Sequence, residues 1–383
     1  MEAIALLQTL SRGEDSRHQF KRNFNNQDSL ASEIIAFSNS EGGSIFIGVD
    51  DDGSIPGLTS EDIHRLNNMI SNAASQGITP PVNPLTESIA VSDKLVLVVK
   101  VPIGLNKPYQ DKNGVIWVKC GSDKRKATSR EELQRLFQSS GMIHADVIPV
   151  NGMTIADIDM PYFSEFFKRK YGESLEAQTI PLSQTISNLN LGQNDTLNLT
   201  GALLFSKAPS VKLPGCIVKA AVFPGNSVTA ETYIDSRDIT GKLSDIYQQT
   251  RSYILSNIKH VQGEQSINSA GQPEIPEIVV EELLVNALIH RDYFISAPVR
   301  VFIFPNRIEI ISPGHLPNNL TVENIKAGNS NVRNPVLASF AYENILPYRG
   351  FGSGILRALE KYREIDFVDD RLNNQFKCTI RRK

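Results

Sequence analysis

The sequence predicts a mixed α/β (α+β) protein with an N-terminal α/β domain over residues 1–145, a middle α/β connector over 146–265 and a C-terminal α/β domain over 266–383. Short apolar runs that end in turn residues alternate with stretches whose apolar residues recur at helical spacing, which indicates strands and helices in alternation. With 383 residues the chain is long enough for two or three domains, each with its own core.

The N-terminal domain is predicted from strongly patterned segments. An apolar run at Ile45–Val49 predicts a strand that is buried on both faces, because polar residues do not alternate with the apolar ones. Ser29 is a candidate N-cap for the preceding helix, and Ser129 with Glu132 forms a capping-box pattern for the last one. The predicted elements are helices over 3–11, about 29–41, 59–75 and 129–140, and strands over 44–49, 94–102 and 114–121.

Composition excludes several classes of protein. The net charge of −3 gives the whole chain no general attraction to nucleic acid or to membranes, so any such partner must be bound by a local patch. The three cysteines are far apart and suggest neither a metal site nor a disulfide framework. No apolar run is long enough for a membrane span, and residues 1–10 lack the pattern of a signal peptide. We therefore expect a cytoplasmic protein that does not contact a membrane.

One helix in the C-terminal domain carries two polar residues in an otherwise apolar pattern. The stretch PEIVVEELLVNALIHRD, residues 276–292, has Glu282 and Asn286 four positions apart, which places them on one face. A buried carboxylate and a buried amide need partners, since an unsatisfied polar group costs about 1–3 kcal/mol. A bound nucleotide would supply those partners, whereas a surface Glu and a helix-packing Asn are the alternative.

A glycine-rich stretch follows near the end of the chain. After a predicted hairpin, VRVFIF–PN–RIEII, the sequence YRGFGSGILRALEKY has Gly350, Gly352 and Gly354 two apart, just before a predicted helix over 354–362. Glycines at this position let backbone N–H groups approach an anion at the start of a helix. The alternative is an ordinary flexible loop.

Basic residues are concentrated in one part of the N-terminal domain. The segment KCGSDKRKATSR would form a positive surface together with Lys21, and such clusters bind phosphates; a solvated face is the alternative. The predicted nucleic-acid-binding residues are Lys21, Lys119, Lys124, Arg125 and Lys126.

Three motifs in the first 140 residues, E-x-x-x-x-Q-F-K (14–21), AFSNSEGG and GVDDDG, resemble the Schlafen-like AlbA domain. The resemblance implies binding of DNA or RNA and, as in some members, a metal-dependent ribonuclease site. Glu14 matches the first catalytic carboxylate of that site, and either Asp50 or Asp51 matches the last one. Gln19 replaces the second carboxylate, which keeps an oxygen but removes a full charge from a site that binds Mg²⁺.

The order E-x-x-x-N, hairpin, SPGxLP, RNP and RGxGSGI resembles a divergent GHKL-type ATPase domain, an α/β sandwich. The resemblance implies binding of ATP and Mg²⁺: Glu282 would activate the attacking water, and Asn286 would be the magnesium ligand. Arg291 would contact phosphate or form part of a structural network. Ser312 stands near the expected adenine-reading Asp, and His290 stands where many members have an acid, so we expect weak ATPase activity at most. The matching glycines are Gly314, Gly350, Gly352 and Gly354.

These two domains occur together in bacterial proteins described as transcriptional regulators, and the combination resembles this chain over almost its whole length. We therefore expect an ATP-responsive, nucleic-acid-binding regulator that forms a homo-oligomer. The alternative is a metal-dependent nuclease effector of antiviral (phage) defence that is triggered by nucleotide. A third hypothesis is a scaffold that binds only other proteins.

Overall fold

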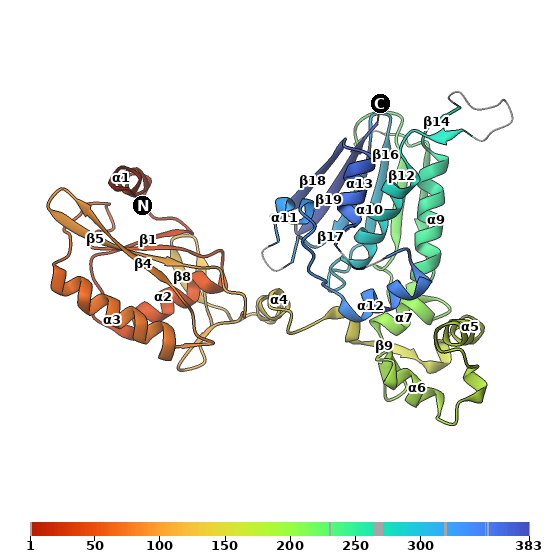
Figure 1. The fold of residues 1–383 in the computed structure, drawn as a ribbon, viewed down its shortest axis with the longest axis horizontal. Helices are drawn as coiled ribbons and strands as arrows, with labels where there is room; N and C mark the ends of the chain where they lie inside the picture. Colours follow the sequence, from red (N-terminus) through yellow and green to blue (C-terminus); the bar gives the residue numbers. More distant parts are fainter. Residues whose placement is uncertain are drawn as a thin grey trace. The chain divides into compact units, whose positions relative to one another are not determined.

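The computed structural model describes residues 2–229, 231–262, 271–317, 320–348, 350 and 352–382. The chain forms two compact units, which we call unit 1 (Met1–Ile143) and unit 2 (His144–Lys383). Each unit combines helices with a β-sheet (Figure 1), so the predicted α/β (α+β) fold class is confirmed. In the part of the chain that the structure describes, no helix is long and apolar enough to cross a membrane.

Unit 1 is built on a four-stranded sheet with the order β1-β2-β5-β4, in which only β1 and β2 run parallel. Its helices are α1 (Ala3–Leu10), α2 (Gln27–Asn39), α3 (Ser60–Gln76) and α4 (Arg130–Ser139). Its strands are β1 (His18–Lys21), β2 (Gly43–Ile47), β3 (Ile78–Thr79), β4 (Leu85–Val91), β5 (Lys94–Val101), β6 (Gln110–Asp111), β7 (Trp117–Cys120) and β8 (Asp123–Lys126).

Strand β2 is buried on both faces, as its continuous apolar run predicts. Ile45 and Ile47 belong to the core cluster that includes residues of α2 and α3, whereas Phe46 belongs to the cluster under α1. Successive side chains of a strand point to opposite faces, so an uninterrupted apolar run serves two cores at once. Figure 1 shows α1 on one side of this sheet, with α2 and α3 on the other.

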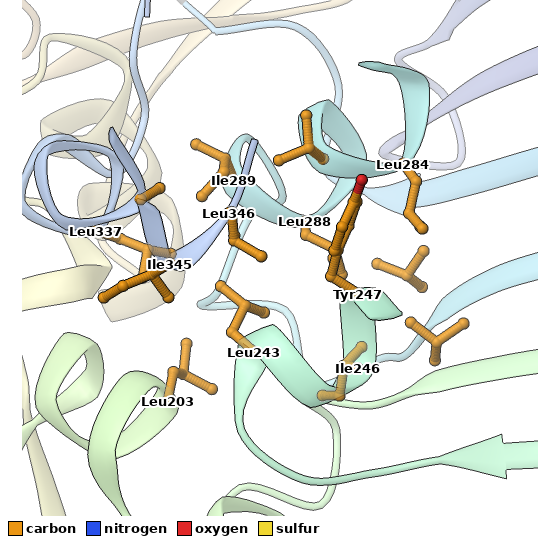
Figure 2. Packing of buried hydrophobic residues seen from close by; sticks show 14 of the residues in the cluster. Leu203, Leu243, Ile246, Tyr247, Leu284, Leu288, Ile289, Leu337, Ile345 and Leu346 are labelled. Atoms are coloured by element: carbon orange, nitrogen blue, oxygen red, sulfur yellow. The ribbon is translucent and has the colours of Figure 1, made fainter. Parts of the chain in front are cut away.

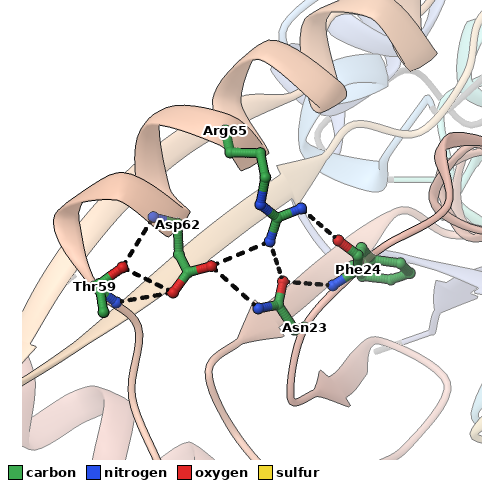
Figure 3. A network of polar contacts seen from close by, with 5 residues as sticks. All are labelled: Asn23, Phe24, Thr59, Asp62 and Arg65. Carbon is green, nitrogen blue, oxygen red and sulfur yellow. Dashed lines mark hydrogen bonds and ion pairs between the residues drawn. The ribbon is translucent and has the colours of Figure 1, made fainter.

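Local capping fixes where the helices of unit 1 begin. Helix α2 begins earlier than predicted, because Asn26 rather than Ser29 is its N-cap and accepts a hydrogen bond from the N–H of Asp28. At the start of α3, Thr59 and Asp62 form a reciprocal capping box, and Arg65 joins Asp62 to Asn23 and Phe24 (Figure 3). These hydrogen bonds lower the pKa of Asp62 to about 2. The network ties α3 to the loop between β1 and α2.

Unit 2 is built on a six-stranded sheet with the order β13-β12-β16-β17-β19-β18. Its strands are β9 (Pro149–Thr154), β10 (Gly192–Gln193), β11 (Thr196–Asn198), β12 (Val218–Val222), β13 (Asp235–Ile239), β14 (His260–Val261), β15 (Gln272–Pro273), β16 (Val299–Phe304), β17 (Arg307–Pro313), β18 (Ile365–Asp370) and β19 (Gln375–Arg381). Its α-helices are α5 (Met160–Tyr171), α6 (Leu182–Asn188), α7 (Leu199–Phe205), α8 (Pro209–Lys212), α9 (Leu243–Ser256), α10 (Glu277–Ile289), α11 (Val322–Lys326), α12 (Pro335–Phe340) and α13 (Gly354–Lys361).

Helices α9, α10 and α13 cover one face of this sheet (Figure 1). Helix α10 is buried around most of its circumference, with Val280 and Val285 buried in addition to the predicted apolar stripe. A helix that is apolar all round belongs in a core, and α10 packs on β17 with α9 and α13 as its helical neighbours. The layered arrangement agrees with the α/β sandwich implied by the resemblance.

The middle of the chain contributes directly to the sheet and the core of unit 2. Strand β12 pairs with β13 on one side and runs parallel to β16 on the other. Leu203 and Leu243 pack in the same apolar cluster as Leu284 and Leu346 (Figure 2). Residues 218–239 and 299–381 therefore share one sheet, and the middle of the chain shares its apolar core.

Candidate functional site

Unit 2 contains a pocket between α10, α13 and the ends of β17 and β19. It encloses about 1030 Å³ of space, counted with its open mouth. Its lining combines apolar side chains with a few polar groups, which is typical of a ligand site. The pocket brings together six residues that the sequence predicts for one site: Glu282, Asn286, Gly314, Gly350, Gly352 and Gly354.

Helix α10 presents the acid and the amide to this pocket. Glu282 is only 6% exposed, and the Nδ2 of Asn286 donates to the backbone carbonyl of Glu282 at 2.6 Å. This bond fixes the orientation of the amide one turn away from the carboxylate. The spacing of four therefore produces the shared face that the sequence predicts, and both side chains line the pocket.

The carboxylate of Glu282 is also the point where α13 meets α10. The Nη2 of Arg357, on α13, lies 2.5 Å from Oε1 of Glu282. A Cβ atom added to Gly354 would lie 2.3 Å from Oε2 of Glu282, so a larger residue there would displace the carboxylate from its present position. The Nε of Arg357 is buried and has no hydrogen-bond acceptor among the described residues. The sequence did not single out Arg357, since nothing in its spacing relates it to Glu282.

Two further ionisable side chains line the pocket and are neutral near pH 7. The Nε2 of His290 and the hydroxyl of Tyr348 are 3.0 Å apart. Burial, together with the charge of Arg333, lowers the pKa of His290 to about 4. Burial, together with the charge of Glu282, raises the pKa of Tyr348 to about 12. The pair therefore adds polar atoms to the pocket without adding charge.

Ser312 is buried at the end of β17 and lines the same pocket. Its hydroxyl donates to the backbone carbonyl of Ala287 at 2.9 Å, which leaves its lone pairs as acceptors. The residue can therefore accept a hydrogen bond from an amino group, although a neutral hydroxyl is a weaker acceptor than the carboxylate expected from the resemblance.

Arg291 is a structural residue in this arrangement and does not line the pocket. It is 2% exposed, and its guanidinium donates to the carbonyls of Gly215, Ile295 and Ala297. A buried cation needs such acceptors, and here the backbone supplies them. Arg291 therefore fits the predicted structural network and not a phosphate contact.

The RNP motif holds the end of α10. Arg333 donates to the carbonyls of His290 and His315, and Asn334 donates to those of Ile289 and Arg291. The last carbonyls of a helix have no partners within the helix, so these side chains replace the missing ones. The motif therefore positions the helix that carries Glu282.

Gly314 lies against Arg333 of this motif. It has φ +95°, and an added Cβ would lie 2.4 Å from the Nη1 of Arg333 and 2.5 Å from the Cβ of Asp292. Both the backbone conformation and the lack of space require glycine there.

In unit 1, the predicted carboxylates are engaged in hydrogen bonds or solvated. The Oε1 of Glu14 accepts from the Nε2 of Gln19 at 2.7 Å and from the N–H of Phe20 at 2.6 Å. The Oε1 of Gln19 in turn accepts from the Nζ of Lys119 at 2.6 Å. Asp50 lies 4.0 Å from Arg22, and Asp51 is exposed. In the described segments, no group of three or more His, Cys, Asp or Glu residues could hold a metal ion.

Most of the predicted basic surface is already paired. Lys124 lies 2.8 Å from the buried Glu33, and Arg125 makes a bidentate pair with Glu132. Lys119 is half-buried beside Gln19, and its burial lowers its pKa. Lys126 is exposed, and its Nζ lies 5.6 Å from the ring centre of Trp117, while Lys21 is partly exposed. The solvent-facing cations are therefore fewer than the sequence predicts.

Comparisons with known proteins agree with both resemblances. Residues 14–128 match the family described as "Schlafen, AlbA_2", and residues 296–377 match the family described as "Putative ATP-dependent DNA helicase recG C-terminal". The second match begins after α10, so Glu282 and Asn286 precede it. No curated protein matches the chain.

Two solved structures are similar to parts or all of the chain. The DIP2311 protein from Corynebacterium diphtheriae matches at 18% identity over 99% of this chain and 69% of its own, with a TM-score of 0.46. The N-terminal domain of a "Putative ATP-dependent DNA Helicase RecG-related Protein" from Nitrosomonas europaea matches at 27% identity over 34% of this chain and 96% of its own, with a TM-score of 0.26. The family matches thus place a segment similar to Schlafen AlbA_2 domains in unit 1 and a segment similar to the HATPase-type recG C-terminal family in unit 2.

Proposed function

We propose that this protein is an ATP-responsive regulator that binds nucleic acid through unit 1 and ATP through the pocket of unit 2. The observation that carries the proposal is the pocket itself, in which Glu282 and Asn286 meet the glycine-rich turn and the start of α13. A carboxylate, an amide and backbone N–H groups around one cavity suit a magnesium-bound polyphosphate.

The residues present fit ATP with Mg²⁺. The amide oxygen of Asn286 would ligate the metal ion, which neutralises phosphate charge when bound. The backbone N–H groups of Gly350, Gly352 and Gly354 would donate to phosphate oxygens, and the buried Nε of Arg357 lacks the acceptor that a phosphate would provide. Ser312 would accept from the adenine amino group, and Glu282 would orient a water molecule. The weak acceptor at Ser312 favours nucleotide sensing over rapid hydrolysis.

A melting scan of the purified protein with ATP, ADP and AMP in the presence of Mg²⁺ tests the nucleotide site. A ligand at a hundred times its dissociation constant stabilises the folded state by about 2.7 kcal/mol, which is easily measured. We expect ATP to raise the melting temperature. If no nucleotide changes it, the regulator proposal fails and the scaffold hypothesis remains.

For nucleic acid, the support is the AlbA_2 match together with the exposed Lys126 beside Trp117 and the partly exposed Lys21. Cations of this kind bind phosphates. Labelled DNA and RNA should bind with an affinity that changes when Mg-ATP is added. Identical binding curves with and without Mg-ATP would remove the regulatory link, and sedimentation of the same samples tests for the expected homo-oligomer.

The nuclease alternative has weaker support, because Glu14 is hydrogen-bonded to Gln19 and Gln19 is hydrogen-bonded to Lys119. An ammonium group beside these side chains opposes the approach of a second cation. Structured RNA with Mg²⁺ or Mn²⁺ should therefore remain intact in the presence of the protein. Cleavage that is lost in Glu14→Ala would instead establish the nuclease.

A further inference from the structure

We propose that Arg357 selects nucleoside triphosphates over diphosphates by leaving Glu282 for the terminal phosphate. This inference rests on the proposed nucleotide site and assigns a role to a residue outside every predicted motif. It makes Arg357 a specificity-determining residue of that site.

The ion pair between Arg357 and Glu282 lies on the pocket wall. Nη2 of Arg357 is 2.5 Å from Oε1 of Glu282, and both residues line the cavity. Arg357 thereby uses one edge of its guanidinium, while its buried Nε has no acceptor in the described part of the chain. A guanidinium presents its donors as a rigid fork, so an anion that engages Nε and a neighbouring Nη satisfies the group better than this carboxylate does.

A polyphosphate that enters this pocket competes for the same cation. The carboxylate and the phosphate are both anions, so their direct approach is unfavourable unless a cation lies between them. Arg357 is already in place, and bidentate pairing with a phosphate is among its strongest interactions. The affinity for the ligand is therefore reduced by whatever free energy is needed to separate Arg357 from Glu282.

The place where Arg357 of α13 contacts α10, at Glu282, points to the end of the phosphate chain. Ser312, which offers an acceptor for a base, is bonded to the carbonyl of Ala287. Ala287 lies five residues from Glu282, or about 7.5 Å along the helix axis. The base-reading end and the Arg357 end of the pocket are thus separated, and the more distant phosphate falls nearer to Arg357. A diphosphate lacks that group.

Binding measurements on the full chain test the inference, with Mg²⁺ and either ADP or a β,γ-imido analogue of ATP that is not hydrolysed. Arg357→Met should weaken binding of the analogue about tenfold or more, the equivalent of about 1.4 kcal/mol. The affinity of the Arg357→Met protein for ADP should stay within about threefold of that of the unmodified protein. Lys361→Met removes an exposed cation from the same helix and should change neither affinity.

A second variant should change the affinity for the analogue in the opposite direction. Glu282→Gln removes the competing charge, so it should tighten binding of the analogue about threefold or more. The double variant should resemble Arg357→Met, because the tightening requires the guanidinium. Melting temperatures measured without ligand show whether each variant is folded, and the double variant avoids leaving a buried carboxylate without Arg357.

The outcomes separate this inference from the function on which it rests. If the unmodified protein binds neither nucleotide, both fail. If it binds both, but Arg357→Met weakens ADP and the analogue equally or weakens neither, the selectivity role is overturned while the nucleotide site stands. Weaker binding of the analogue by Glu282→Gln would also overturn the proposed competition between the Glu282 carboxylate and the phosphate for Arg357.

Discussion

Asp146 connects the middle of the chain to α12 at the scale of a single residue. It is fully buried, and its Oδ2 accepts the N–H groups of Val336 and Leu337. Burial raises the pKa of its carboxyl group, which means that the site disfavours the charged form. The two hydrogen bonds therefore stabilise the fold, while the cost of burying the charged form opposes part of that stabilisation.

Substitutions at Asp146 should separate these two effects. Asp146→Ala leaves two N–H groups without an acceptor and should destabilise the protein by about 1–3 kcal/mol. Asp146→Asn keeps an acceptor without the charge, so at pH 7 it should melt at or above the unmodified protein. The raised pKa means that the folded state takes up a proton more readily, so the advantage of Asn should shrink as the pH falls. Melting curves of the three proteins between pH 8 and pH 5 check this, and an Asn variant as unstable as Ala would contradict it.

His290 should make the protein sensitive to acid. Its pKa is lowered to about 4 by burial, so the folded state keeps it neutral while the unfolded chain protonates near pH 6.5. Its contribution to stability is present above pH 6.5 and is lost as the pH falls from 6.5 toward 4, on the order of a few kcal/mol. Melting temperatures should fall over this range, and less steeply in His290→Gln. His315, whose pKa burial also lowers, keeps part of the slope in that variant. Equal slopes would show that His290 is not the cause.

At the residue scale, the sequence predicts which side chains lie close together when they belong to the same helix or turn. Glu282 and Asn286 share a face because they lie four apart in one helix, and the glycines belong to the neighbouring turn. Arg357 and Tyr348 were missed because their contacts depend on how α13 and the preceding turn pack on α10. Arg291 could not be assigned, since a buried cation and a phosphate contact look the same in sequence.

At the scale of elements, α13 packs closely on α10 because Gly354 has no side chain at the contact. Gly354→Ala should favour an isolated helix by about 1 kcal/mol. Here the new methyl group would displace the Glu282 carboxylate, which is held by Arg357, so the variant should instead lower the melting temperature. In a Glu282→Ala background the methyl group has room, and the same substitution should be neutral or stabilising. The same loss in both backgrounds would locate the strain elsewhere.

Element boundaries could be predicted where a capping residue marks them and not where two candidates compete. Ser129 caps α4 as the pattern indicates, whereas Asn26 displaces Ser29 at α2. Strand β4 was missed because its residues are largely exposed at the edge of the sheet. The sequence of β8 predicts only a basic run and no strand, because its pairing with β7 depends on the turn between them.

At the scale of the whole molecule, the division into two units should be visible in fragments. Residues 1–143 and 144–383 each contain complete sheets and their own cores, so each should unfold cooperatively when produced alone. A fragment of residues 266–383 lacks β12 and β13, which leaves β16 without a neighbour on one side. We expect it to show no cooperative transition in thermal denaturation followed by circular dichroism. A sharp transition for 266–383 would mean that the connector is a separate domain.

The sequence could not reveal this shared sheet, because the pairing is distant along the chain. Val218–Val222 pairs with Val299–Phe304, about eighty residues later, and no local pattern encodes which strands become neighbours. The two domain resemblances were recognised because their motifs are local and ordered.

The parallel pairing of β12 and β16 also determines which wall of the cavity stays fixed. Helices α9 and α10 belong to the connection between these adjacent strands, and α10 packs on β17 and α9, while Arg333 and Asn334 hold its C-terminal end. A helix anchored in this way moves little by itself, and ligand-driven displacement falls to α13, which closes the opposite wall. An environment-sensitive dye attached at Lys361 should therefore change its emission when ligand enters, whereas the same dye on the outer surface of α9 should not.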